Sequence, residues 1–351
     1  MTLSFQKKLI KKATKWLTAV ATLATAQIVA ELLVKAIMVA VQGGHLSYLR
    51  YRNEYLKRLS AEYDITFENL EKVAAKIEDE CVPWVKAARM RPLIVKLGGS
   101  VITDKRGRFS VKLSSLRRLA RELKAADGPL VVVHGGGSYG HPIASKFEIA
   151  RGFKNEEQLM GFSLTHRAME ELNTHVIEAL QRAGLPAIAI QPSACSVVSD
   201  GRIVRMELAP LHKFLELGIV PVTYGDVVPD LSRGMSILSG DQLVVYLARE
   251  LGASRVILGA DVDGVFTADP KLRSREKLIR VITPSSWRDV VKSIGVASGP
   301  DVTGGMAKKV EELLILAESG IEAEIVNAAK ADTLKRAILG ERGLGTKIMA
   351  G

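Results

Sequence analysis

Two glycine-rich turns follow short apolar segments, and basic side chains stand beside both turns. The first lies in residues 92–100 and contains Gly98-Gly99, and the second lies in residues 129–141 and contains Gly135-Gly136-Gly137. Glycine lets the backbone approach a ligand closely, and backbone N–H groups exposed at such turns bind anions. The basic side chains beside the turns are Lys96, Lys105 and His141. This combination predicts a site for more than one phosphate and makes phosphoryl transfer the leading hypothesis.

Acidic residues further along the chain are candidates for the same site. Asp241 follows Gly240 at the predicted start of a helix, where a carboxylate can also serve simply as a cap. Asp261 and Asp263 follow an apolar segment at strand spacing, which predicts a nucleotide contact or a metal ligand pair. An ordinary Asp-Gly turn at residues 263–264 is the alternative interpretation.

A third glycine-containing segment, residues 301–309, is predicted to lead into a helix that spans 305–319. Lys308 and Lys309 would then lie in the first turn of that helix, close to Gly305. Cations are unfavourable at a helix N-terminus. Their presence there is easier to explain if an anion such as a nucleotide phosphate lies opposite.

The positive charge of the chain is spread along its length. The net charge is +11, and residues 1–90 hold fourteen of the 49 Lys and Arg and nine of the 38 Asp and Glu. Phosphorylated small molecules suit this charge. Aromatic residues make up only 5% and are not interleaved with basic ones, which disfavours nucleic-acid binding. Cys81 and Cys195 are too few for a disulfide framework or a zinc site, so a cytoplasmic location is expected.

The first 90 residues differ in composition from the remainder, with two glycines out of 30. They predict an all-helical N-terminal segment with helices at 5–42, 47–60 and 66–80. The role of this segment is not evident from its residues. Every motif considered above lies after Met90, which is therefore an alternative start of the working enzyme.

Residues 16–41 are largely apolar and follow a lysine-rich start, which is also typical of a membrane anchor or a signal peptide. Glu31 and Lys35 interrupt the apolar stretch, and a charge at mid-bilayer costs about 2.5–3.5 kcal/mol on insertion scales. Their spacing also suits a helix that pairs its charges at a surface. A packing or oligomerisation helix is favoured, and membrane contact through 16–41 is the alternative.

Strands and helices alternate from residue 91 to the end, which predicts a mostly parallel sheet covered by helices on both faces. The expected strands are 92–97, 129–134, 186–191, 195–198, 219–224, 255–260, 322–327 and 345–349, and the expected helices are 112–126, 156–183, 240–251 and 305–319.

The glycines at 135, 137 and 140 also match a dinucleotide-binding fingerprint. That interpretation requires an acidic residue at the end of a second strand about 20 residues later. Residues 154–161 are instead predicted to be helical. A nicotinamide-dependent oxidoreductase is therefore a minor alternative.

Six motifs occur together in one order and resemble the amino acid kinase superfamily, in particular its isopentenyl phosphate kinases. They are Lys96-Leu-Gly-Gly-Ser-Val-Ile-Thr-Asp-Lys105, His134-Gly-Gly-Gly-Ser-Tyr-Gly-His141-Pro, Gly225-Asp226-Val, Ser239-Gly-Asp241, Asp261-Val-Asp263-Gly-Val and Asp301-Val-Thr-Gly-Gly-Met306. His141 and the last motif narrow the resemblance to these members. Tyr139 stands where the family often has Phe. The resemblance covers residues 91–351 and leaves 1–90 unexplained.

The resemblance implies an α/β fold, a three-layer αβα sandwich whose N-terminal half binds the acceptor and whose C-terminal half binds ATP. Lys96, Lys105, His141 and Asp241 would be catalytic. Gly136, Gly137, His141 and Gly240 would hold the acceptor phosphate, and the ATP site would comprise Lys96, Gly98, Gly99, Asp261, Asp263, Gly305 and Lys309.

The implied reaction is the ATP- and Mg²⁺-dependent phosphorylation of isopentenyl phosphate to isopentenyl diphosphate by a homodimer, with no metal ligands assigned to the protein itself and no nucleic-acid partner. Fosfomycin-type kinases, or other small phosphate or phosphonate kinases of the superfamily, are the nearest alternative. A ligand sensor without activity on the same fold is an alternative of another class.

Overall fold

The structure is a computed structural model that describes residues 91–104, 107–267, 277–295 and 303–351, together with 54, 56–58, 60 and 61. Those among residues 54–60 are helical, as expected for the predicted helix 47–60. The predicted helices 5–42 and 66–80, the apolar segment 16–41, Met90 and Lys105 lie outside the described residues. Residues Arg91–Arg249 and Ala253–Gly351 form one compact unit.

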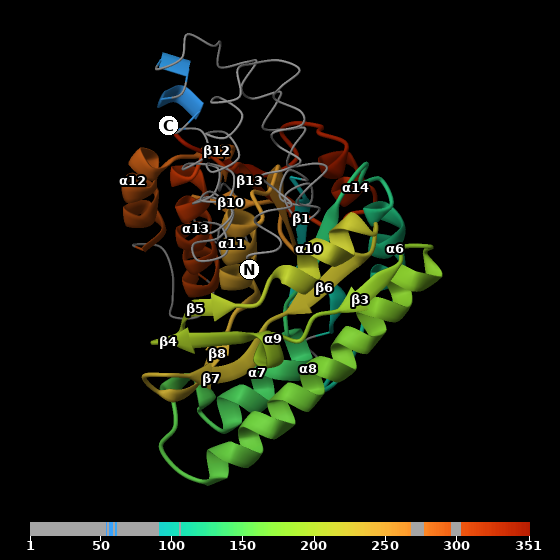
Figure 1. Cartoon of the computed structure of the whole chain (residues 1–351), viewed down its shortest axis with the longest axis vertical. Helices are drawn as coiled ribbons and strands as arrows, with labels where there is room; N and C mark the ends of the chain where they lie inside the picture. Colours follow the sequence, from blue (N-terminus) through green and yellow to red (C-terminus); the bar gives the residue numbers. More distant parts are fainter. Residues whose placement is uncertain are drawn as a thin grey trace, which may run out of the picture. The chain divides into compact units, whose positions relative to one another are not determined.

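An eight-stranded sheet forms the centre of this unit (Figure 1). Its order is β12 (Val281–Ile282), β14 (Thr346–Ile348), β13 (Ala323–Asn327), β9 (Arg255–Ala260), β1 (Leu93–Leu97), β2 (Leu130–His134), β6 (Val220–Tyr224) and β3 (Ala187–Ala189). Neighbouring strands run parallel except at the β13–β14 pair. The mostly parallel sheet predicted from the alternation is therefore confirmed.

A second, four-stranded sheet has the order β5 (Arg202–Met206), β4 (Ser196–Ser199), β7 (Asp226–Asp230) and β8 (Gly234–Leu238). The pair β10 (Val265–Phe266) and β11 (Leu278–Ile279) forms a short hairpin. The helices are α5 (Gly99–Ile102), α6 (Leu113–Leu123), α7 (Gly137–Lys146), α8 (Glu157–Arg182), α9 (Pro192–Cys195), α10 (Ala209–Glu216), α11 (Gly240–Glu250), α12 (Pro284–Gly295), α13 (Thr303–Glu318) and α14 (Thr333–Ile338), with a 3₁₀ turn at Ile149–Arg151.

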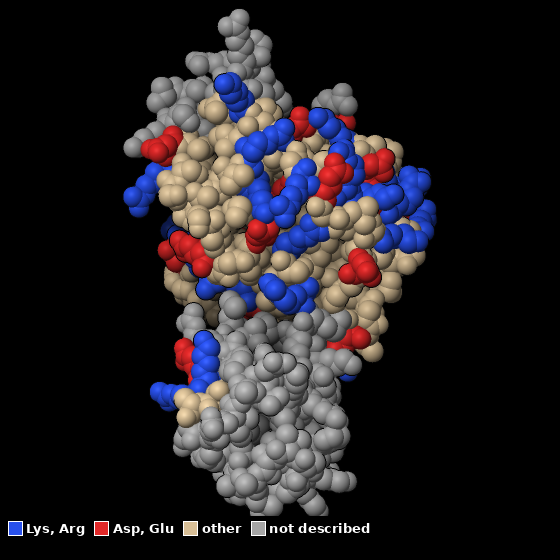
Figure 2. Space-filling model, turned by 90° about the horizontal axis from the view of Figure 1, so that it is seen from above, with Lys and Arg blue, Asp and Glu red and all other residues tan. Residues whose placement is uncertain are grey.

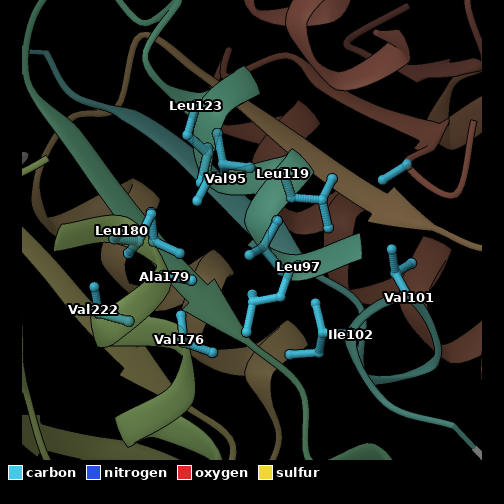
Figure 3. Packing of buried hydrophobic residues seen from close by; sticks show 14 of the residues in the cluster. Val95, Leu97, Val101, Ile102, Leu119, Leu123, Val176, Ala179, Leu180 and Val222 are labelled. Carbon is cyan, nitrogen blue, oxygen red and sulfur yellow. The ribbon is translucent and has the colours of Figure 1, made fainter. Parts of the chain in front are cut away.

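The two faces of β1 have different partners. Val95 and Leu97 pack into a buried cluster with side chains of α6 and α8, including Leu119 and Leu180 (Figure 3). Successive side chains of a strand point to opposite faces. Lys96 therefore points to the other face, where it meets α11. Burial of the apolar residues on one side thus fixes the direction of the one lysine on β1.

Charged side chains of both signs share the face seen in Figure 2. Lys and Arg are numerous there, and Asp and Glu lie among them. This agrees with a positive charge that is distributed along the sequence. In the part of the chain that the structure describes, no helix is both long enough and apolar enough to cross a membrane.

Candidate active site

The two glycine turns touch each other through their backbones. β1 and β2 pair with Leu97 opposite His134, so the turns that follow them emerge side by side. A Cβ atom built on Gly99 would lie 2.4 Å from the backbone nitrogen of Gly137, and one on Gly135 would lie 2.9 Å from that of Gly99. Gly137 also has a positive φ of 47°. Only glycine allows this approach, which brings two groups of backbone donors into one place.

A buried carboxylate beside the turns joins two lysines from distant parts of the chain. Lys96 Nζ lies 2.5 Å from Asp241 Oδ1, and Lys309 Nζ donates a hydrogen bond of 2.7 Å to Asp241 Oδ2. The side chains of Lys96 and Asp241 are 6% and 14% exposed, and that of Lys309 is 32% exposed. Two cations share one anion, so the cluster carries an excess positive charge that faces the cleft described below.

Burial and charge act in opposite directions on these groups. Burial lowers the pKa of Lys96 to about 8, although Asp241 opposes the shift; Lys309 adds to it. Burial alone would raise the pKa of Asp241, but the two lysines outweigh it and hold that pKa below its ordinary value. Lys96 is therefore protonated at neutral pH and close to its titration range.

Asp241 is free to bind lysines because another residue caps its helix. Ser239 Oγ accepts a hydrogen bond from the Gln242 backbone nitrogen, and Gln242 Oε1 accepts one from the Ser239 nitrogen. This reciprocal pair is a capping box at the start of α11. The sequence left open whether Asp241 was only a cap, and the structure assigns capping to Ser239.

Gly240 closes the site from the α11 side. A Cβ atom there would lie 3.1 Å from Lys96 Cε and 3.2 Å from the carbonyl oxygen of His134. That same carbonyl accepts a hydrogen bond of 3.0 Å from the Gly225 nitrogen. The ends of β2 and β6 and the beginning of α11 therefore converge on Lys96.

A cleft of about 1740 Å³ runs past these groups. Its lining includes most of the residues predicted from the sequence, namely Lys96, Gly98, Gly99, Gly136, Gly137, His141, Gly240, Asp241, Asp261, Gly305 and Lys309. His141 is exposed on α7, one turn after the glycines. Lys105 lies outside the described residues, so its predicted role stays a prediction.

The two acids after β9 have different surroundings. Asp261 lines the cleft and accepts a hydrogen bond of 2.8 Å from Ser100 Oγ. Asp263 is bound instead by Asn327 Nδ2 at 2.8 Å and by Lys330 Nζ at 2.6 Å, and is not part of the lining. Among the described residues, no group of three or more His, Cys, Asp and Glu side chains is arranged to hold a metal ion.

The helix that carries Lys309 begins earlier than its sequence suggested. α13 starts at Thr303, so Lys308 and Lys309 lie in its second turn and not in its first. The argument from an unfavourable helix N-terminus is therefore wrong. Lys309 is explained by Asp241, which compensates its charge directly.

A polar bridge at the edge of the cleft was not foreseen. Arg202 Nη1, at the start of β5, lies 2.7 Å from the Glu312 carboxylate on α13, and both residues line the cleft. Gln242 Nε2 also donates to the carbonyl oxygen of Gly201 at 2.9 Å. These contacts join residues far apart in the sequence, and no local motif announces them.

Comparison with known proteins places this geometry in a family. The amino acid kinase family matches residues 91–327. The isopentenyl phosphate kinase of Methanothermobacter thermautotrophicus is 44% identical over 73% of this chain and 98% of its own length. That of Methanocaldococcus jannaschii is 35% identical over 71% of this chain and 95% of its own.

The structural comparison agrees. A crystal structure of isopentenyl phosphate kinase superposes with a TM-score of 0.65 at 41% identity and covers 74% of this chain and all of the other. A substrate complex of isopentenyl phosphate kinase gives a TM-score of 0.62 at 30% identity over 74% of this chain and 99% of the other. The fold, the paired glycine turns and these relatives together show that the chain is a kinase that belongs to the amino acid kinase family, among its isopentenyl phosphate kinases.

Proposed function

We propose that this enzyme transfers the γ-phosphoryl group of ATP to the phosphate of isopentenyl phosphate, giving isopentenyl diphosphate and ADP. The Lys96–Asp241–Lys309 cluster beside two touching glycine turns is the observation that carries the proposal. Phosphoryl transfer needs alignment and positive charge around a metaphosphate-like centre more than it needs covalent help from the protein. The family names of the relatives supply the acceptor.

The roles proposed for the residues are those that the family resemblance implies, and the positions of the side chains in the cleft support them. Lys96 meets the phosphoryl group in transit, and Lys309 meets the phosphates of ATP from the α13 side. His141 holds the acceptor phosphate from α7. Asp241 orients both lysines, and its negative charge opposes the lowering of the Lys96 pKa by burial. The acceptor oxygen is already anionic, so no strong general base is required.

Mg²⁺ would be carried by the phosphates of ATP, where it neutralises charge during transfer. This chain's own acids suit that arrangement better than a protein-held metal. Asp263 is engaged by Lys330 and Asn327, and Asp261 is held by Ser100. Asp261 is a carboxylate of the cleft lining that would contact a hydrated ion or the nucleotide. The proposal also includes a cytoplasmic location and a homodimer. Light scattering of the purified protein tests the homodimer.

The deciding experiment measures ADP release with isopentenyl phosphate, dimethylallyl phosphate, geranyl phosphate and fosfomycin as acceptors. We expect the highest kcat/KM with isopentenyl phosphate and a product with two coupled phosphorus signals by NMR. Preference for fosfomycin would replace the proposed acceptor. ATP binding without turnover on any acceptor would favour a sensor.

A further inference from the structure

A buried carboxylate at the cleft has no role in the reaction as described above. Asp226 begins β7, is 2% exposed and lines the cleft. Its Oδ1 accepts a hydrogen bond of 2.8 Å from the Val227 backbone nitrogen. Its other partners are the side chain of Ser193 and His166 on α8, whose Nδ1 lies 3.0 Å from Oδ2 and 3.2 Å from Oδ1.

His166 stands between two carboxylates. Its Nε2 lies 3.3 Å from Glu170 Oε1 on the same helix and 3.1 Å from the Gln191 amide nitrogen. Ser193 Oγ, from α9, is 3.4 Å from its Nδ1. Tyr224 at the end of β6 is the next titratable neighbour, and burial first, then Asp226, then Glu170, raises its pKa.

The pair connects to the catalytic cluster through one residue. Asp226 follows Gly225, whose nitrogen donates to the carbonyl oxygen of His134 at 3.0 Å. A Cβ atom on Gly225 would lie 3.1 Å from the nitrogen of Gly240, so the two backbones are nearly in contact. Gly240 directly precedes Asp241. Anchoring of Asp226 by His166 therefore fixes the turn against which α11 begins.

The other end of β7 offers a direct comparison. Asp230 is 3% exposed, and its carboxylate accepts hydrogen bonds from the backbone nitrogens of Asp200, Gly201, Ser232 and Arg233. Burial opposes its ionisation, but these bonds prevail and lower its pKa. For Asp226 burial prevails over His166 and raises the pKa to about 6. Asp230 thus stabilises its turn, whereas the charge on Asp226 is buried at a cost to stability. Groups retained at such a cost cluster at functional sites.

We propose that Asp226 and His166 are a positioning pair for phosphoryl transfer, whose hydrogen-bonded contact holds the Gly225 turn against the start of α11 and so keeps Asp241 aligned with Lys96. This inference rests on the proposed function. The pair touches no reacting atom and acts through Gly225 and Gly240. Neutralising Asp226 removes its attraction for His166 and lets the turn shift.

The test compares Asp226→Asn with Asp230→Asn, two isosteric changes of buried acids on one strand. For Asp226→Asn we expect kcat for isopentenyl phosphate to fall about tenfold or more, the KM for ATP to stay within about twofold, and the melting temperature at pH 8 to stay level or rise, because a costly buried charge is gone. For Asp230→Asn we expect a lower melting temperature, with kcat within about twofold below that temperature.

The dependence of kcat on pH distinguishes a positioning role of Asp226 from a purely structural one, because a purely structural role would leave that dependence unchanged. The acceptor phosphate titrates in the same range as Asp226, so the difference between variants is diagnostic. Wild-type kcat should fall below about pH 6 more steeply than that of Asp226→Asn. His166→Asn, whose amide can still donate to Asp226, should keep more activity than His166→Phe. Glu170→Gln, which leaves the Asp226 contact in place, should stay near wild type.

Two results would overturn the inference. One is an Asp226→Asn enzyme with wild-type kcat and pH profile, and the other is loss of activity only in step with loss of thermal stability. Both require a wild-type enzyme that phosphorylates isopentenyl phosphate. If the wild type fails to do so, the proposed function is wrong, and that failure is seen before any variant is compared.

Discussion

Lys96 and Lys309 are 213 positions apart in the chain and bind the two oxygens of the same carboxylate, that of Asp241. β1 and α13 belong to the two halves to which the family resemblance assigns acceptor and ATP. Asp241 therefore fixes the distance between a cation of one half and a cation of the other. Phosphoryl transfer in line between two bound phosphates requires this kind of alignment.

Replacement of Lys96 by Met should affect turnover far more than binding. In the proposed mechanism Lys96 meets charge that develops in the transition state, and loss of such a group costs about 10²- to 10³-fold in kcat. The KM for ATP should change by no more than about threefold. The fold should survive, because removal of a buried ammonium relieves desolvation. Steady-state kinetics and thermal melting check this, with Lys124→Met, at the exposed C-cap of α6, as the control. Normal turnover with weak ATP binding would assign Lys96 to ground-state binding.

His141→Ala should lose about ten- to a hundredfold in kcat/KM for isopentenyl phosphate. A charge-assisted hydrogen bond to phosphate is worth about 1.5–3 kcal/mol. The KM for ATP should hardly change, because His141 lies on α7 beside the acceptor turn. His175→Ala, a histidine of α8 outside the cleft lining, is the matched control. A His141→Ala enzyme within twofold of wild type would refute the assignment.

Activity should decline above about pH 8 as Lys96 loses its proton. Burial lowers the pKa of Lys96, and Asp241 partly restores it, so Asp241→Asn should move this decline to lower pH in addition to lowering kcat. The lowered pKa of Lys96 also changes how the free energy of unfolding depends on pH. Between pH 8 and 10.5 the unfolded chain binds the proton that native Lys96 releases, so this group makes the protein more stable as pH rises. Profiles of kcat against pH for the wild type and for Asp241→Asn test this prediction. An alkaline decline at the same pH in both enzymes would contradict the pairing of Asp241 with Lys96.

Gly99→Ala should impair both folding and activity, because its methyl group would meet the backbone of Gly137 at 2.4 Å. Gly305→Ala is the control. A Cβ atom on Gly305 meets nothing within 4 Å, and alanine inside a helix is worth about 0.5–1 kcal/mol over glycine. Thermal melting should therefore move in opposite directions for the two variants. Equal melting temperatures for Gly99→Ala and Gly305→Ala would mean that the two glycine turns can move apart without loss of stability.

A protein that comprises Met90–Gly351 should be soluble and active. The described motifs all lie after Met90, and the family matches residues 91–327. We expect removal of residues 1–89 to affect the oligomeric state of the protein more than its activity. Purification and the ADP-release assay provide the measurement. A truncated protein that is folded by circular dichroism yet inactive would show that residues 1–90 contribute to the site.

The sequence predicted the central strands well because their signal is local. Residues 92–97 and 129–134 are largely apolar stretches that glycines follow directly, and β1 and β2 lie within one residue of these bounds. β7 and β8 were missed, since the Asp226–Asp230 strand contains a proline and two acids whose burial depends on partners elsewhere. The early start of α13 was missed because Gly304-Gly305 is typical of a loop.

The site was predictable as a set of residues and not as a set of contacts. The glycine turns and Lys96 indicate phosphate binding by their own chemistry. The pairing of Asp241 with Lys96 and Lys309 has no local signal, because the three residues are far apart in the sequence. The contact between His166 and Asp226 spans 60 positions, and His166 sits in a long helix with no local feature that marks it. Distances of this kind arise from the packing of α8 on β7 and are not encoded in any short segment.

Because of the backbone contact between Gly99 and Gly137, the donor-to-acceptor distance and the choice of acceptor depend on different parts of the cleft. It sets the spacing of the two glycine turns by main-chain atoms, so substitutions elsewhere in the cleft leave that spacing almost unchanged. Other parts of the cleft, in contrast, are lined by side chains such as Met169 and Val227. Redesign for bulkier alkyl phosphates should therefore alter KM while the donor-to-acceptor distance, and with it kcat, persists. Substitution of lining side chains should therefore change the range of accepted alkyl phosphates without altering the residues that carry out phosphoryl transfer.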